Sequence, residues 1–196
     1  MPQANFPSSV LSAQSTFRAI LDATSRPGSI QPINGVADAP QPLSPGAAAV
    51  ALTLCDHDTP VWIDSGLSAS APVSEWLRFY CGCPIVQNPR DAAFAFAGEP
   101  KALPPFDAFN LGTAEYPDRS TTIVLQVASF KAGPHLNLTG PGIRERISLR
   151  ADPLPSDIAA RLAFNRGLFP RGVDLMLVTH NAVAALPRSV HVASED

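Results

Sequence analysis

The chain has 196 residues, of which 45% are hydrophobic and only 16% are charged, so a single domain with a sizeable core is expected over residues 1–196. The net charge of −3 disfavours binding to nucleic acid or to an anionic membrane. The longest apolar run, residues 47–55, is too short to span a bilayer, and residues 1–10 lack a secretory-signal pattern. Together with an odd count of three cysteines, these features predict a cytoplasmic protein.

The first half of the chain is predicted to be mainly helical. A helix is expected over residues 15–25, capped by Ser12 or Ser15 and ended by the Arg-Pro-Gly sequence at 26–28. An Ala-rich segment at 46–56 is apolar almost all round, which is typical of a buried helix. A third helix is expected at 73–81, and short strands are expected just after residue 30 and at 61–63.

Strands dominate the prediction for the second half. Strands are expected at 92–97, 121–127, 173–179 and 188–192, with a hairpin over 136–149 that turns at Gly140-Pro141-Gly142. A helix capped by Ser156 is expected at 156–164, and one helical turn at 182–186. The mixture indicates an α/β fold with a mixed central sheet, containing 121–127 and 173–179, flanked by helices. The Pro-rich segment 99–109 is where two lobes would divide, although no linker forces a boundary.

The densest polar stretch is the loop at 112–120, which precedes a predicted buried strand. Its candidate ligand or interface residues are Glu115, Tyr116, Asp118, Arg119 and Ser120. Arg119 suits phosphate oxygens because its planar guanidinium offers paired donors. The alternative is a turn held by an internal Asp–Arg pair, because turns favour these residue types.

Other polar clusters have simpler explanations beside the functional ones. The Cys81-Gly82-Cys83 sequence lacks a second ligand pair at zinc-site spacing, so incidental thiols are favoured. The Asp-His-Asp sequence at 56–58 is interpreted as a solvated turn, and the Gly-Pro-Gly turn lacks a phosphate-loop pattern. Arg166 and Arg171 would either clamp an anion or stabilise a helix end, and the two alternatives stay open.

Several segments, in order along nearly the whole chain, together resemble one family. It is the PhnH family, the H subunit of the carbon–phosphorus lyase system of phosphonate metabolism. The segments are FRAILDA at 17–23, SRPG at 25–28, LTLCD at 52–56, TPVW at 59–62, GTAEYPDRS at 112–120, GPGI at 140–143, FPRGVD at 169–174 and LPR at 186–188.

The resemblance implies a fold similar to that of pyridoxal-phosphate-dependent transferases, without the cofactor. It implies a homodimer in isolation and, in the cell, a complex with the G, I and J subunits. That transferase complex makes alpha-D-ribose 1-phosphonate 5-triphosphate from ATP and an alkylphosphonate, and the resemblance implies a role as an accessory subunit that is not catalytic alone. No catalytic, cofactor-binding or metal-binding residue is assigned to this chain.

Two alternatives from the residues remain open beside the subunit hypothesis. An independent pyridoxal-phosphate-type transferase needs a buried lysine, and neither Lys101 nor Lys131 is expected to be buried. A stand-alone small-anion or nucleotide-binding module would use Arg119 with Arg26 or Arg171. The subunit hypothesis instead predicts faces that a partner covers, at residues 100–109 with Phe106 and Phe109, and on the helix that carries Trp76 and Tyr80.

Overall fold

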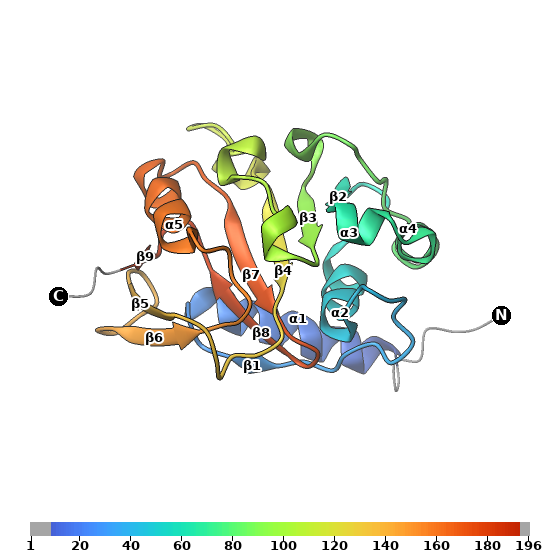
Figure 1. Cartoon of the computed structure of the whole chain (residues 1–196), viewed down its shortest axis with the longest axis horizontal. Helices are drawn as coiled ribbons and strands as arrows, with labels where there is room; N and C mark the ends of the chain where they lie inside the picture. Colours follow the sequence, from blue (N-terminus) through green and yellow to red (C-terminus); the bar gives the residue numbers. More distant parts are fainter. Residues whose placement is uncertain (1–8, 193–196) are drawn as a thin grey trace.

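The structure is a computed structural model that describes residues 9–192. Within this range the larger sheet has six strands in the order β1-β8-β7-β4-β3-β2 (Figure 1). They are β1 (Gln31–Pro32), β2 (Val61–Ile63), β3 (Phe94–Ala97), β4 (Thr122–Gln126), β7 (Asp174–Val178) and β8 (Ala182–Leu186). Strands β2, β3, β4 and β7 are parallel, whereas β8 and β1 run antiparallel to their neighbours, so the predicted mixed central sheet is confirmed.

A smaller sheet of three strands lies beside the larger one. Its order is β6-β5-β9, with β5 (His135–Thr139), β6 (Ile147–Arg150) and β9 (His191–Val192). The β5–β6 pair is the predicted hairpin, and its antiparallel register joins Leu136 to Leu149, but its second strand begins at Ile147 rather than at 143 as predicted. The predicted last strand is shorter than expected and pairs with β5.

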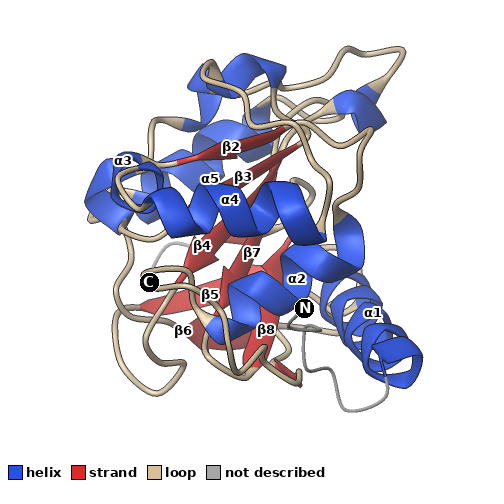
Figure 2. Ribbon diagram, turned by 90° about the vertical axis from the view of Figure 1, so that its right-hand side faces the viewer, coloured by secondary structure: helices blue, strands red, loops and turns tan. Residues whose placement is uncertain are grey.

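Helices cover one face of the larger sheet, and one further helix together with the smaller sheet covers the other, so the larger sheet forms the middle layer. Figure 2 shows α2 and α4 in front of the strands and α5 behind them. The helices are α1 (Ser9–Ser25), α2 (Pro45–Leu54), α3 (Ser65–Ser68), α4 (Ala71–Tyr80) and α5 (Ile158–Gly167). Single 3₁₀ turns are η1 (Pro89–Asp91), η2 (Pro100–Ala102), η3 (Phe106–Ala108) and η4 (Pro117–Arg119).

Alternation along the strands divides the apolar residues between two core clusters. In β4, Val124 faces the cluster that includes α2, whereas Ile123 and Leu125 face the cluster that includes α5. Because both faces are covered, β4 is an almost continuous apolar run, as predicted for a doubly buried strand. Helix α2 begins after Ser44, whose hydroxyl accepts a hydrogen bond from the Ala47 amide at 3.2 Å, and it is buried as predicted.

The predicted helical turn at 182–186 is wrong, because this segment forms β8. The sequence Ala-Val-Ala-Ala-Leu is apolar at every position, so its periodicity does not distinguish a helix from a buried strand. Pairing decides the outcome: β8 runs antiparallel to β7, joining Val183 to Val178 and Leu186 to Leu175. A tight turn connects them, with the Thr179 amide donating to the Ala182 carbonyl at 2.9 Å.

The predicted helix caps are also wrong at two helices. Helix α1 is already helical at Ser9, so Ser12 and Ser15 lie inside it rather than at its start. Ser156 does not cap α5, because Asp157 occupies the cap position and its side chain makes no capping hydrogen bond. The sequence also predicts a frayed tail at 193–196, and these residues lie outside the described range.

Residues 100–109 are not the exposed face that the sequence predicted. Leu103, Phe106 and Phe109 are all buried in the cluster that also contains α5 residues, so this segment closes the core. On α4, Trp76 is buried too, and the exposed aromatic side chain is its neighbour Phe79, which is 70% exposed.

Gly46 in α2 provides a test of how closely this helix lies against β7. A Cβ atom at Gly46 would lie 2.0 Å from the Thr179 carbonyl oxygen, so Gly46→Ala is expected to destabilise the protein by about 1–3 kcal/mol through overpacking. Gly167 in α5 is the matched control, because nothing lies within 4 Å of its Cβ position. Urea unfolding of Gly167→Ala is expected to show stability unchanged or raised by up to about 1 kcal/mol. Equal stability losses in both variants would contradict the proposed contact.

Candidate functional site

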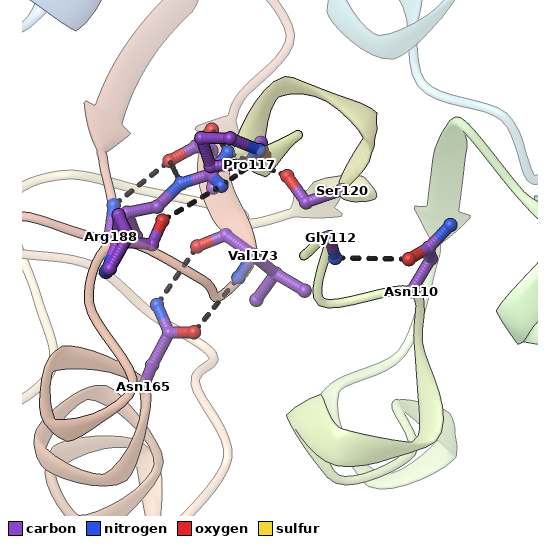
Figure 3. Close-up of polar contacts among 9 residues, drawn as sticks. Asn110, Gly112, Pro117, Ser120, Asn165, Val173 and Arg188 are labelled. Carbon is purple, nitrogen blue, oxygen red and sulfur yellow. Dashed lines mark hydrogen bonds and ion pairs between the residues drawn. The ribbon is translucent and has the colours of Figure 1, made fainter. Parts of the chain in front are cut away.

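Arg188, just after β8, is the centre of the polar network at one end of the larger sheet. Its Nε donates to Asp174 Oδ1 at 3.2 Å and its Nη2 donates to Asp174 Oδ2 at 2.5 Å (Figure 3). The Arg188 backbone amide also donates to Asp174 Oδ1 at 2.9 Å. A bidentate pair of this kind fixes the direction of the guanidinium as well as its position.

The same guanidinium holds the predicted 112–120 loop. Its Nη2 donates to Ser120 Oγ at 2.6 Å, and its Nη1 donates to the Pro117 carbonyl at 2.5 Å. The Arg188 side chain is only 14% exposed, so these bonds are largely shielded from water. The loop is therefore fixed to the sheet at both Pro117 and Ser120.

Asn165 of α5 makes a second connection in the same region. Its Nδ2 donates to the Val173 carbonyl at 2.8 Å, and its Oδ1 accepts from the Val173 amide at 2.9 Å (Figure 3). The Gly172 amide in turn donates to the Leu111 carbonyl at 2.8 Å. A Cβ atom at Gly172 would lie 2.6 Å from Asn165 Oδ1, so the close approach needs glycine, whose φ is +128°.

The predicted loop residues divide into one anchor and four exposed groups. Ser120 is buried, whereas Glu115, Tyr116, Asp118 and Arg119 are exposed. The Arg119 guanidinium carbon lies 4.3 Å from the centre of the Tyr116 ring, a cation–π arrangement. The alternative of a turn is confirmed, because Pro117 begins a 3₁₀ turn, but within residues 9–192 no ion pair joins Asp118 to Arg119, so the expected internal pair is wrong. The loop thus exposes the Tyr116–Arg119 pair to solvent, while Pro117 and Ser120 hold the loop in place.

Arg26, the sixth predicted site residue, belongs to a different place. It lies just after α1, where its Nη2 is 2.9 Å from Asp22 Oδ1, and it lines a pocket formed with the β5–β6 loop. None of the hydrogen bonds and ion pairs of the described residues joins Arg26 to the 112–120 loop.

The 112–120 loop lies at the amino end of the parallel strands, because it leads into β4, and Asp174 begins β7. Open parallel sheets usually bind ligands beyond the carboxyl ends of their strands. Here the chain itself fills the carboxyl ends of β2 and β3, whereas a pocket of about 330 Å³ lies beyond those of β4 and β7. The fully buried Asp64 carboxylate accepts hydrogen bonds from the amides of Leu67, Gly98 and Glu99 at 2.8–3.1 Å. Gln126, at the end of β4, donates to the Pro42 carbonyl at 3.2 Å.

A polar pocket of about 340 Å³ adjoins the start of the loop. Its lining includes Arg90, Asn110, Gly112 and Arg171, with no carboxylate among the lining residues. Asn110 Oδ1 accepts from the Gly112 amide at 3.0 Å, which shapes the entry to the loop (Figure 3). Of the two arginines left open by the sequence, Arg171 lines this pocket, and Arg166 lies 5.1 Å from the Phe169 ring.

Sequence reasoning missed the residues that organise the site. Arg188, Asp174 and Asn165 were not predicted as site residues, although the first two end segments that carry the family resemblance. The available signal was the position of Asp174 and Arg188 at the ends of predicted buried segments, because a charged side chain that is partly buried needs a partner of opposite charge.

The two lysines do not suit pyridoxal-phosphate chemistry. Lys101 and Lys131 are both exposed, as expected, and a Schiff-base lysine works from a buried position against the cofactor. This observation disfavours the alternative of an independent pyridoxal-phosphate-type transferase.

The three cysteines are free thiols gathered near the end of α4. Burial raises the pKa of the Cys55 thiol. A hydrogen bond between the side chains of Cys81 and Cys83 raises the pKa of Cys81 and lowers that of Cys83. Within residues 9–192 there is no group of three or more His, Cys, Asp or Glu side chains arranged to hold a metal ion. None of the helices in this range is long and apolar enough to cross a membrane.

Comparison with known proteins identifies the family. The family model described as bacterial phosphonate metabolism protein (PhnH) matches residues 4–193. The chain is 44% identical over 191 residues to "Alpha-D-ribose 1-methylphosphonate 5-triphosphate synthase subunit PhnH" of Rhizobium meliloti (strain 1021), covering 97% of this chain and 94% of that protein. Over 83 residues, 42% of each chain, it is 43% identical to "Putative C-P lyase subunit protein HtxG" of Stutzerimonas stutzeri. The chain therefore belongs to the PhnH family of bacterial phosphonate-metabolism proteins.

Replacing Arg188 tests its role in holding the loop. Arg188→Ala leaves Asp174 without its bidentate partner and is expected to cost about 2–3 kcal/mol, because Asp174 is partly exposed. Amide hydrogen exchange should speed up across residues 112–120. Arg161→Ala is the control, since Arg161 is similarly shielded and donates to Asp157 and to the Leu103 and Pro104 carbonyls. It should lower stability without affecting exchange in the loop, and equal effects of the two variants would contradict this role.

The thiol pair gives a prediction for alkylation kinetics. Because Cys83 holds the pKa of Cys81 high, Cys81 should react slowly with iodoacetamide near pH 8. Removing the partner in Cys83→Ala lowers the Cys81 pKa toward its ordinary value, so labelling of Cys81 should accelerate. Mass spectrometry of the labelled peptide measures this rate, with Cys55→Ala as the control that keeps the pair. An unchanged Cys81 rate in Cys83→Ala would show that the hydrogen bond does not control its reactivity.

Proposed function

We propose that this chain is an accessory subunit of a carbon–phosphorus lyase complex that makes an alpha-D-ribose 1-phosphonate 5-triphosphate from ATP and an alkylphosphonate. The observation that carries the proposal is the 44% identity to a synthase subunit over 94% of that protein's length. Such coverage supports transferring the role of the whole subunit rather than that of a shared segment. The chain is proposed to act as a single H-subunit domain.

The loop geometry supports a role in contact rather than in catalysis. Four of the predicted loop residues point into solvent, and the buried anchors beneath them are engaged with one another. Tyr116 and Phe169 are 51% and 55% exposed, and the segments that carry them are joined through Arg188, which also reaches the Pro170 carbonyl. Exposed aromatic and arginine side chains on a rigid base are the residue types that interfaces favour.

The finer parts of the proposal follow the family resemblance. We propose the G, I and J subunits as partners, a homodimer when the chain is isolated, and a cytoplasmic location, which the three free thiols favour. The mixed sheet between helical layers supports a relation to the pyridoxal-phosphate-dependent transferase fold. The exposed lysines support a role without that cofactor.

Co-purification tests the assembly. The tagged chain is expressed with the neighbouring genes of its operon, and stoichiometric partners are identified by mass spectrometry. Recovery of the G, I and J subunits supports the proposal. Recovery of the tagged chain alone, as a homodimer, argues against a subunit role and favours an independent binding function.

The loop has its own test in cells. Arg119→Ala removes the guanidinium above Tyr116 without disturbing the buried anchors, so stability should stay within about 0.5 kcal/mol. Growth on methylphosphonate as the sole phosphorus source should slow, together with weaker recovery of partner subunits. Arg18→Ala, an exposed arginine on α1, is the charge-matched control and should grow normally. Normal growth and normal recovery with Arg119→Ala would exclude the loop as an interface.

A further inference from the structure

A second basic pocket, outside the Arg188 network, lies between the end of α1 and the loop that joins β5 to β6. Its volume is about 440 Å³, which is within the range of sites for small ligands. Three arginines line it, Arg26 on one side and Arg144 and Arg146 on the other. Ser29 also lines it, and its hydroxyl accepts a hydrogen bond from Gln31 Nε2 at 3.0 Å.

The two walls of this pocket pack closely at two glycines. Gly28, after α1, lies against residues of β5 and β6, and Gly142, in the β5–β6 loop, lies against the end of α1. A Cβ atom at Gly28 would lie 2.8 Å from both Ile147 Cγ2 and Leu138 Cδ1. A Cβ atom at Gly142 would lie 2.3 Å from the Ser25 carbonyl oxygen, and both glycines have positive φ, +79° and +81°. Close backbone packing at these two glycines thus sets the shape of the pocket, and a larger residue at either position would disrupt it.

The charges in the pocket favour an anion. Arg26 is paired with Asp22, but Arg144 and Arg146 make no ion pair within the described residues. Glu145 is the one carboxylate among the lining residues, so the guanidinium groups outnumber it. The carboxyl end of α1 opposes an anion, but this effect is confined to the last turn and is smaller than that of two unpaired arginines.

An apolar surface completes the pocket beside the arginines. Pro27, Ile143 and Ile147 contribute it, and Pro27 is itself buried. This arrangement suits a ligand with a charged head and a small organic remainder. Arginine offers paired donors that match the oxygens of a phosphoryl or phosphonyl group.

We propose that this pocket binds the –PO₃ group of a small phosphorylated or phosphonylated metabolite. Arg144 and Arg146 contact its oxygens, Arg26 and Ser29 complete the polar side, and the organic part packs on Pro27 and Ile143. The proposal does not rest on the subunit role, because the walls of the pocket belong entirely to this chain. It adds a ligand site to a protein whose exposed loop is proposed to serve contact with partners.

Calorimetry on the full chain, in about 0.15 M salt to screen weak surface attraction, tests the site. The probes are methylphosphonate, inorganic phosphate and tripolyphosphate, with a short poly-glutamate peptide as a separate arm. We expect saturable binding of at least one –PO₃ probe below about 10 mM. Binding of methylphosphonate but not of phosphate would indicate a phosphonate ligand, and the reverse result would indicate a phosphate ligand. Binding of the peptide without any –PO₃ probe would instead assign the pocket to an acidic protein segment and overturn the proposal.

The decisive variant is Arg144→Ala/Arg146→Ala, in which both exposed side chains are replaced without affecting either glycine contact. Binding should weaken at least about tenfold, since each lost charge-assisted hydrogen bond accounts for about that factor. Arg78→Ala/Lys101→Ala removes the same charge elsewhere and should stay within about twofold. Unchanged melting temperatures establish that both variants are folded. No binding by the wild-type chain, or equal losses in the two variants, would overturn the proposal.

Discussion

The bidentate contact between Arg188 and Asp174 is the constraint on which the amino end of the sheet depends. Asp174 begins β7 and Arg188 follows β8, so the contact closes the antiparallel pair at its end. The donors that remain on the guanidinium then fix Pro117 and Ser120, which belong to a loop far away in the sequence. Arg188 therefore links the paired strands β7 and β8 to the 112–120 loop and fixes the position of that loop.

The carboxyl ends of the parallel strands are only partly occupied by the chain's own loops. Beyond the carboxyl ends of β2 and β4, Asp64 and Gln126 are engaged with backbone groups of the chain's own loops. A buried carboxylate with three amide partners has little capacity left for a ligand. The fold thus uses Asp64 to hold the loops after β2 and β3, and it leaves a pocket of about 330 Å³ beyond the carboxyl ends of β4 and β7, where open parallel sheets usually bind small molecules.

Local sequence signals predicted most of the elements but not the polar network. The β-branched run at 121–127 and the Ala-rich helix at 46–56 were identifiable because burial on all sides gives an unbroken apolar pattern. The same property misled the prediction at 182–186, where only pairing with β7 distinguishes strand from helix. Phe106 and Phe109 were expected on an exposed face because proline-rich segments are usually superficial, yet they fill the core.

The site was predictable only in part, for a related reason. The density of polar residues identified the loop at 112–120, but Arg188 and Asn165 act through contacts with residues 8–71 positions away, which no local pattern reveals. Arg26 was grouped with the loop by charge alone, and the structure assigns it to another pocket.

The order of the Arg188 contacts along the chain also has a consequence for synthesis. Arg188 comes after all of its partners, namely Pro117, Ser120, Pro170 and Asp174. Because a polypeptide leaves the ribosome from its amino end, the loop emerges long before the side chain that immobilises it. The contacts that hold the segment carrying Tyr116 and Arg119 can therefore form only after Arg188 itself has left the ribosome.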